Sequence, residues 1–290
     1  SMMYGPFIIL YLLFYHYFYG LSLLLLSIAI SFIPTSFNRN SCYRYIFTII
    51  LKYFSHQGLW NEYIPLDKPS IIVGPPHGVF PFGSLLGCMS IPRTSGVYMR
   101  GIAASALLYF PIIGNFLRYV GIIDASRKNV IKHLNNGESI GISSGGIAEI
   151  FETKNVVINN TDTYQECIIL KSRGGICKLA LTTGSYLIPS YIFGNSNCLS
   201  IWYDKYGIML KLSRLLRVSI VFFWGRWYLP IPYRTPILGV LGEPIHVVKN
   251  ENPTQEDVNK LLNILEVKIK ELFDKHKAAY GWENVELIIK

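Results

Sequence analysis

The sequence predicts an α/β domain, in which a mainly parallel sheet is flanked by helices, preceded by an apolar N-terminal membrane anchor. Short β-branched runs alternate with helix-like stretches along most of the chain, which is typical of βαβ units. Of the 290 residues, 51% are apolar and only 16% are charged, whereas soluble domains average about 25% charged residues. Residues 1–38 contain no Asp, Glu, Lys or Arg. We therefore divide the chain into an anchor (residues 1–38), an interfacial connecting segment (residues 39–69) and the α/β domain (residues 70–290).

The anchor is predicted from the nearly continuous apolar run over residues 6–33. A transmembrane helix needs about 20 residues, so this run is long enough to cross a bilayer once with tilt. A helical hairpin bent near Gly20 is the alternative. A cleaved signal peptide is not expected, because a basic leading segment is missing and the run is too long. Arg39, Arg44 and Lys52 follow the run, which assigns its end to the cytosolic side.

The following elements are predicted in chain order. Residues 43–54 mix aromatic and basic side chains, which suits a helix lying at the membrane interface. Residues 71–73 form a short buried strand. Further strands are predicted at 139–142, 186–189 and 238–241, with helices at 128–135 and 176–183 between them. A long amphipathic helix begins at Thr254, where Asp257 completes a near capping box, and Gly281 stops it.

Charge and cysteine content narrow the possible partners. Lys and Arg outnumber Asp and Glu by 27 to 18, which predicts a basic face towards anionic lipid or a polyanionic substrate. Nucleic acid is not expected as a partner, since no binding motif accompanies the charge. The five cysteines are scattered singly, without the spacing of a zinc site or a disulfide framework. We expect no metal, and free thiols in a reducing compartment.

His77 is the first candidate for chemistry. It lies in Gly74-Pro75-Pro76-His77-Gly78, directly after the strand at 71–73. Ligands of open α/β sheets bind beyond the carboxyl ends of the strands, and Gly78 permits a close backbone approach. The unperturbed pKa of histidine suits proton transfer near neutral pH. On this pattern alone, a structural histidine in a stiff turn is an equal alternative.

The second candidate segment follows the strand at 139–142. Gly145 and Gly146 predict a tight turn whose N–H groups can face an oxyanion, and Glu149 stands one turn further on. Residues 141–145 also match the Gly-x-Ser-x-Gly pattern of a nucleophile elbow centred on Ser143. A serine hydrolase would then need an acid and a histidine downstream, and the possible partners are Asp204 with His246 or His276.

Basic residues near predicted strand ends could bind phosphate groups. Arg173 precedes the helix that carries Lys178, and Arg127 follows Asp124-Ala125-Ser126. Arginine can bind phosphate through two parallel hydrogen bonds. A solvated helix start explains the same residues equally well.

Taken in order, these segments resemble the type-two diacylglycerol acyltransferase family, with its monoacylglycerol and wax-ester acyltransferase relatives. The resemblance extends from about residue 71 to near the C-terminus, and its strength lies in the order of the blocks. The matching blocks are Gly74-Pro75-Pro76-His77-Gly78, Phe110-Pro111-Ile112-Ile113-Gly114, Gly121 to Arg127, Gly145-Gly146-Ile147-Ala148-Glu149, Arg173 to Ala180, Ile188-Pro189, Phe193-Gly194, Gly225-Arg226, Ile231 to Ile237, Gly242-Glu243-Pro244-Ile245, Pro253-Thr254 and Leu272 to Lys277.

The resemblance implies a membrane-anchored enzyme with a glycerolipid-acyltransferase-like fold, at the cytosolic face of the endoplasmic reticulum or at the lipid-droplet surface. Its substrates would be acyl-CoA and a lipid acceptor such as diacylglycerol, with no further cofactor. Two positions depart from the family. Pro75 replaces the first histidine of the family block, and Phe82 stands five residues after His77, where related glycerophosphate-type acyltransferases have Asp.

We therefore expect His77 to act as general base and Glu149 to orient its imidazole, as the acid of a triad does. Backbone N–H groups at Gly78 or at Gly145 and Gly146 would stabilise the oxyanion. Arg173 and Lys178 would hold CoA, and Arg127 would bind substrate. The serine hydrolase and a non-catalytic lipid-binding droplet protein remain as alternatives. The sequence leaves open the acceptor, the acyl-chain preference and the oligomeric state.

Overall fold

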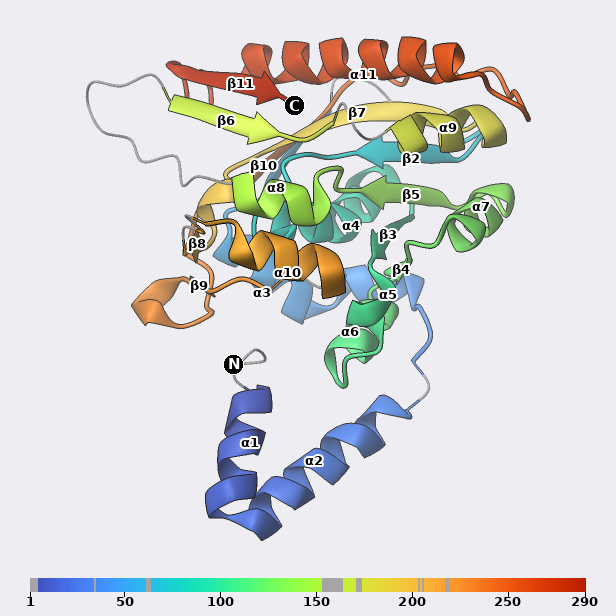
Figure 1. Ribbon diagram of the computed structural model, residues 1–290. Helices are drawn as coiled ribbons and strands as arrows, with labels where there is room; N and C mark the ends of the chain where they lie inside the picture. Colours follow the sequence, from blue (N-terminus) through green and yellow to red (C-terminus); the bar gives the residue numbers. More distant parts are fainter. Residues whose placement is uncertain are drawn as a thin grey trace.

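The computed structural model of the chain describes residues 5–33, 35–60, 64–152, 164–170, 174–202, 204, 206–216 and 220–290. A seven-stranded sheet in the order β1-β10-β7-β2-β5-β3-β4 organises the domain (Figure 1). Its strands are β1 (Gln57–Trp60), β2 (Ser70–Val73), β3 (Met99–Ala103), β4 (Ile123–Asp124), β5 (Ser139–Ile142), β7 (Tyr186–Phe193) and β10 (Leu238–Leu241).

The sheet is mainly parallel, as predicted. β7, β2, β5, β3 and β4 run in one direction. β10 pairs antiparallel with β7, and β1 pairs parallel with β10, so these two run the other way. The described residues also form two small two-stranded sheets, which pair β6 (Tyr164–Ile168) with β11 (Val285–Ile289) and β8 (Ser200–Ile201) with β9 (Phe223–Trp224).

Helices cover both faces of the sheet, and this explains the unbroken apolar run of β2. Ile71 and Val73 pack into the large core under α7, α9 and α11, whereas Ile72 packs into a second core with residues of α4. The described helices of the domain are α3 (Tyr45–Tyr53), α4 (Phe82–Ser95), α5 (Ser105–Leu108), α6 (Ile113–Tyr119), α7 (Arg127–Asn135), α8 (Gly146–Glu152), α9 (Gly174–Thr183), α10 (Ile208–Leu216) and α11 (Gln255–His276).

The predicted elements with a clear pattern are confirmed. β5 and β10 coincide with predicted strands, and β2 begins one residue earlier than predicted. β7 begins as predicted and extends four residues further, to Phe193. α7 and α9 correspond to the two predicted helices within two residues. At α11 the Thr254 side chain and Asp257 form the full capping box. The helix ends at His276, a few residues before Gly281, which adopts a positive φ of 84°.

The apolar N-terminal segment does not form the single long helix that could have crossed a bilayer. It forms a hairpin of two helices, α1 (Gly5–Tyr15) and α2 (Tyr17–Ser31), with the bend at His16 and not at Gly20. Within the described ranges, none of the helices combines the length and the hydropathy required to cross a bilayer. The hairpin projects below the domain, on the side that carries α3, α5 and α6 (Figure 1).

Buried Asn115 ties the hairpin to the domain. Its side-chain amide in α6 donates to the carbonyl of Ile30 at 2.6 Å and to that of Ile33 at 3.4 Å. Further along, the Arg100 guanidinium lies 3.8 Å from the centre of the Phe37 ring. These contacts fix the end of α2 against the domain.

Candidate active site

His77 lies at the carboxyl end of β2, in the middle of the sheet. The segment after Val73 is held on both sides, because Gly74 N–H donates to Ile142 of β5 at 2.8 Å and Pro75 accepts from Ile192 of β7 at 2.9 Å. Pro75 and Pro76 are buried, whereas the His77 side chain is half-buried. The loop therefore presents one accessible imidazole from a fixed backbone, at the edge where parallel sheets bind ligands.

The contact of the His77 ring assigns its tautomer. Nδ1 lies 2.9 Å from the carbonyl oxygen of Gly78. A carbonyl oxygen only accepts hydrogen bonds, so Nδ1 carries the hydrogen in this contact, and in the neutral ring Nε2 is then the basic nitrogen. This tautomer is the one in which Nε2 can accept a proton from a substrate hydroxyl.

Glu149 contacts the main chain of His77, whereas its predicted role in orienting the imidazole stays a prediction. One of its carboxylate oxygens accepts the backbone N–H of His77, and the other accepts the backbone N–H of Ile169 at 3.1 Å. The side chain is completely buried in α8. A buried carboxylate needs such donors, and here it joins the loop after β2 to the segment after β6.

Glycine is required at two positions around these residues. A Cβ atom on Gly145 would lie 1.9 Å from a carboxylate oxygen of Glu149, so only glycine lets that side chain fold back over the turn. Gly78 has a positive φ of 59°, and a Cβ there would lie 2.8 Å from the side-chain nitrogen of Asn195. Gly146, the first residue of α8, also has a positive φ, of 57°.

Asn195 was not foreseen from the sequence, yet its amide shapes the His77 loop. It is 2% exposed and follows β7. Its nitrogen donates to the carbonyls of Pro76, His77 and Phe80, at 3.2, 2.8 and 3.3 Å. Its oxygen accepts the N–H of Gly83 in α4 at 2.9 Å. The only available signal was its place directly after the Phe193-Gly194 block.

Two further buried groups lie within electrostatic range of Glu149. Burial, together with the nearby Glu149 charge, raises the pKa of Glu166 to about 8, although a hydrogen bond from Ser196 opposes that rise. Burial and the two carboxylates also raise the pKa of Tyr191. Glu166 is thus predominantly neutral near pH 7. Nothing in the alternating residues of β6 distinguished Glu166 in advance.

Of the predicted phosphate-binding residues, Arg127 lies away from His77. Arg127 is exposed at the start of α7, after the edge strand β4. Two strands separate β4 from β2, and strand spacing is about 4.8 Å, so this site is roughly 14 Å away. Lys178 is exposed on α9, over the large core. Arg173 lies outside the described residues.

The serine hydrolase alternative at Ser143 gains no geometric support. The Ser143 hydroxyl is buried and has no hydrogen-bond partner among the described residues. Asp204 instead accepts two backbone N–H groups at the start of α10, and His246 packs against the Tyr186 ring. In the described part of the chain, no cluster of His, Cys, Asp and Glu has the arrangement of a metal site.

The two departures from the family pattern have structural roles. Pro75 is buried in the loop after β2, where hydrogen bonds tie this segment to β5 on one side and to β7 on the other. The Phe82 ring packs between Phe54 and Phe80, with ring centres 5.2 and 4.9 Å away. The position five residues after His77 is therefore part of an aromatic core, and the nearby acid comes from α8.

Comparison with known proteins gives the family of this chain. The profile of the diacylglycerol acyltransferase family matches residues 8–290. The bovine Diacylglycerol O-acyltransferase 2-like protein 6 is 29% identical, over 76% of this chain and 69% of its own length. The human Acyl-CoA wax alcohol acyltransferase 1 is 27% identical, over 86% and 77%. The human 2-acylglycerol O-acyltransferase 3 is 25% identical, over 75% and 67%.

Among solved structures, the 1-acyl-sn-glycerophosphate acyltransferase PlsC from Thermotoga maritima aligns with 93% of this chain and 97% of its own, at a TM-score of 0.42 and 18% identity. The match of the family profile to nearly the whole chain is the decisive comparison. The chain belongs to the diacylglycerol acyltransferase family and is an acyltransferase.

Proposed function

We propose that this protein transfers a fatty acyl group from acyl-CoA to the free hydroxyl of diacylglycerol, giving triacylglycerol, with His77 as general base. The observation that carries the proposal is the His77 ring, which is half-buried at the carboxyl end of the central strand with Nδ1 bound to Gly78. Family membership supports acyl-CoA as the donor and an acylglycerol or a long-chain alcohol as the acceptor class.

The proposed reaction is one direct transfer. The acceptor hydroxyl gives its proton to His77 Nε2 while its oxygen attacks the thioester carbonyl carbon. The tetrahedral intermediate then collapses, the carbon–sulfur bond breaks, and the imidazolium returns the proton to the CoA thiolate. General base catalysis of this kind is worth about 10²–10⁴ in rate.

Glu149 has two roles in this mechanism. Its hydrogen bond to the backbone N–H of His77 fixes the loop from which the imidazole projects. A negative charge on this carboxylate, which contacts the His77 backbone, would favour the imidazolium formed during transfer. Backbone N–H groups at Gly78 or at Gly145 and Gly146 would stabilise the oxyanion.

The remaining substrate contacts are assigned by chemistry. Lys178, which is exposed, would bind CoA phosphates together with Arg173, and Arg127 would bind substrate. The aromatic and aliphatic side chains of the hairpin are widely exposed; Phe14 and Phe18 are 81% and 80% exposed. We propose that the hairpin inserts into one leaflet and anchors the enzyme at the cytosolic face of the endoplasmic reticulum or on lipid droplets.

The decisive experiment incubates purified protein with labelled palmitoyl-CoA and a panel of acceptors: diacylglycerol, monoacylglycerol, a long-chain alcohol and a sterol. Triacylglycerol should be the main product. His77→Ala should lower the rate by at least about 10²-fold. Ser143→Ala, the matched control in the same edge of the sheet, should keep wild-type turnover.

Each alternative has its own outcome in this experiment. Loss of activity in Ser143→Ala would indicate a serine nucleophile. Wild-type turnover in His77→Ala would contradict the general base. Lipid binding without consumption of any acyl-CoA would favour a non-catalytic droplet protein.

A further inference from the structure

Glu166 and Ser196 form a buried pair outside the chemistry of the proposed reaction. Glu166 in β6 is 3% exposed, and Ser196 in the 3₁₀ helix η2 (Asn195–Asn197) is 2% exposed. The Ser196 hydroxyl donates to one carboxyl oxygen of Glu166, across 30 positions of the sequence. This hydrogen bond therefore joins β6 to the turn after β7.

Stability alone does not explain the pair. The other carboxyl oxygen of Glu166 and the Tyr191 hydroxyl are buried without a hydrogen-bond partner in the described ranges. Tyr191 is close enough for the Glu166 carboxyl group to add to the rise in its pKa that burial causes. Buried polar atoms without partners lower stability, and apolar side chains of similar size would avoid that cost. A carboxyl group at this position therefore points to a role in the site.

At one end, the pair holds Asn195. Ser196 follows Asn195 directly, and the Asn195 amide binds the carbonyls of Pro76, His77 and Phe80. Movement of η2 away from β6 would therefore move the amide that holds the His77 loop. The Ser196 hydroxyl opposes this movement, because it ties η2 to β6.

At the other end, the pair holds the segment that supports Glu149. Ile169 lies three residues after Glu166 and donates its N–H to a Glu149 oxygen at 3.1 Å. The second Glu149 oxygen accepts the backbone N–H of His77. The bond between Glu166 and Ser196 thus closes a contact ring around the His77 loop. The contact ring consists of His77, Asn195, Ser196, Glu166, Ile169 and Glu149.

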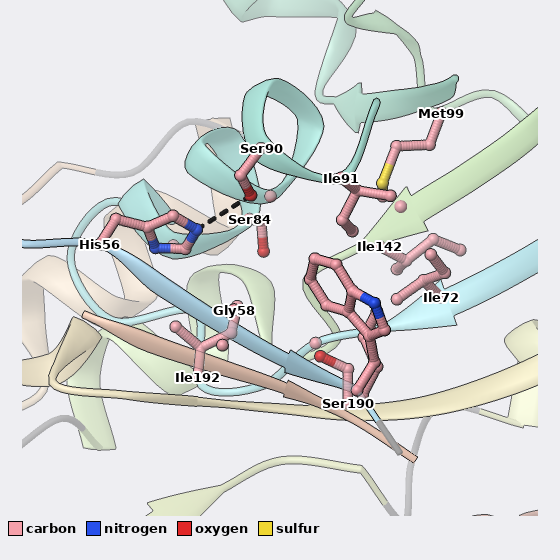
Figure 2. Close-up of a pocket in the computed structure, with 17 residues that line it drawn as sticks. His56, Gly58, Ile72, Ser84, Ser90, Ile91, Met99, Ile142, Ser190 and Ile192 are labelled. Carbon is pink, nitrogen blue, oxygen red and sulfur yellow. Dashed lines mark hydrogen bonds between the residues drawn. The ribbon is translucent and has the colours of Figure 1, made fainter. Parts of the chain in front are cut away.

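The face of the sheet towards α4 gives the loop mainly apolar support. A cavity of about 50 Å³ lies there, between α4 and the sheet, and Gly74 at the start of the loop lines it. Figure 2 shows three isoleucines around it, Ile72, Ile142 and Ile192. Glu149 and Glu166 instead lie within electrostatic range of Tyr191, whose ring packs into the core under α11. The acidic groups of the contact ring therefore support the loop from the face away from α4.

We infer that Glu166 and Ser196 are positioning residues for His77, and that the uncharged carboxyl group of Glu166 is the form that maintains the contact ring. The inference rests on the proposed function, since it takes His77 as the general base. Ser196 acts through Asn195, and Glu166 acts through Ser196 and through the segment that leads to Ile169. A small displacement of a base lowers the rate of the chemical step more than it weakens substrate binding.

The surroundings of Glu166 give the site a pH dependence. Three titratable groups face this carboxyl group, namely Glu149, Tyr191 and Tyr280. β11 places the apolar Leu287 opposite it. Burial raises the pKa of both tyrosines above 10, so both stay neutral below that pH. Burial, followed by the nearby Glu149 carboxyl group, raises the pKa of Glu166 to about 8. Above that pH, Glu166 becomes charged in an enclosed site, which weakens the contact ring.

The first test compares the rates of substituted proteins. Ser196→Ala and Glu166→Leu should each lower kcat with palmitoyl-CoA and diacylglycerol by about tenfold, with KM for palmitoyl-CoA within about twofold of wild type. The double variant should be no slower than the slower single variant, because both changes remove the same bond. Glu166→Gln keeps an oxygen that accepts from Ser196, so it should retain kcat at pH 7.

The matched control is Ser139→Ala. It removes another buried hydroxyl, which accepts the N–H of Ser70 at the opposite end of β2 from His77. Ser139→Ala should lower Tm without lowering kcat. Wild-type kcat in Ser196→Ala and in Glu166→Leu would overturn the inference, whatever the change in Tm.

The second test needs no destabilised protein. The kcat of the wild type should rise as His77 loses its proton and fall again as pH passes about 8, because Glu166 then ionises. Glu166→Gln cannot ionise, so it should keep its kcat above pH 8. A fall of the same size in both proteins would overturn the role of the uncharged carboxyl group.

The third test measures the loop without turnover, by amide hydrogen exchange of residues 74–83. Exchange should be about tenfold faster in Ser196→Ala, since members of the contact ring hold the N–H groups of His77 and Gly83. Ser139→Ala should exchange like the wild type. Equal exchange in all three proteins would overturn the inference. Faster exchange in Ser196→Ala, together with full turnover in His77→Ala, would contradict the general base and leave the positioning of the loop standing, so the two failures are distinguishable.

Discussion

The side-chain amide of Asn195 binds three carbonyl groups of the loop that carries His77 and one N–H group of α4. All four partners lie 112 to 119 residues away from Asn195 in the sequence. A single buried amide thus fixes the backbone on both sides of the candidate base. This contact is the strongest residue-level constraint on the geometry of the site.

Asn195→Ala should therefore lower kcat by about 10- to 100-fold with little change in KM for acyl-CoA, since small misplacement of a reacting group is costly. The variant should also lose stability, because buried backbone groups lose their partner. Steady-state kinetics and thermal unfolding in detergent measure both effects. The matched control is Asn115→Ala, which removes another buried amide, far from His77. Asn115→Ala should lose stability and keep the wild-type kcat. If Asn115→Ala lost as much kcat as Asn195→Ala, the loss in Asn195→Ala would reflect general destabilisation and not the position of His77.

Glu166 gives the fold a pH dependence. Its folded pKa is raised from 4.5 to about 8, so the folded state holds the proton more tightly than the unfolded chain. Its stabilising contribution is complete below pH 4.5 and is lost as pH rises towards about 8. Glu166→Gln mimics the neutral acid, so it should reduce the fall of Tm between pH 5 and pH 8. An identical Tm profile in the variant would show that this carboxyl group is charged when folded.

Among the elements, the helices and strands with the clearest periodicity were predictable. α11 combines an amphipathic repeat with the capping box at Thr254, and β2, β5, β7 and β10 are short buried apolar runs. α4 was missed because its sequence mixes Gly, Ser and Pro without a helical apolar stripe. The pairing of β6 with β11 was missed because it joins segments far apart in the chain.

In the candidate site, too, local sequence patterns were predictable and contacts between distant segments were not. His77 and Glu149 follow neighbouring strands β2 and β5, so their meeting could be inferred from a parallel sheet. Asn195 and Glu166 are brought in by tertiary packing alone. Glycine positions were visible in sequence, but only the structure separates Gly145, which makes room for a carboxylate, from Gly87, which borders the cavity.

At the level of a single helix, Thr254→Ala should cost about 1 kcal/mol by removing the N-cap of α11. For a chain of this size that corresponds to a fall in Tm of about 2–4 °C. Turnover at room temperature should not change, since Thr254 is exposed and lies outside the candidate site. Lys260→Ala is the comparison, because it removes only an exposed ion pair with Glu256 and should shift Tm far less.

For the whole molecule, the arrangement of apolar surface supports the proposed binding to a bilayer. The exposed aromatic side chains of the hairpin project from the side of the domain that carries α3, α5 and α6 (Figure 1). α11 covers the opposite side. The molecule therefore has one face suited to lipid and one suited to water.

Phe14→Asp combined with Phe18→Asp should weaken binding to phospholipid vesicles by at least tenfold, because two apolar contacts become charged. Flotation of protein with vesicles measures the bound fraction. Val267→Asp, a similar change at an exposed position of α11, should leave the bound fraction unchanged. Equal binding of all three proteins would contradict insertion of the hairpin.

The pairing of β6 with β11 has a consequence for how the site comes into existence during synthesis. Ile168 accepts the N–H of Lys290 and Leu170 donates to the carbonyl of Lys290, while Ile169 between them donates to Glu149. Glu149 in turn holds the backbone of His77. A ribosome-bound chain that still lacks β11 can form β2 and β5, but the donor at Ile169 has no strand to hold it. The His77 loop should therefore reach its final form only after β11 has left the ribosome.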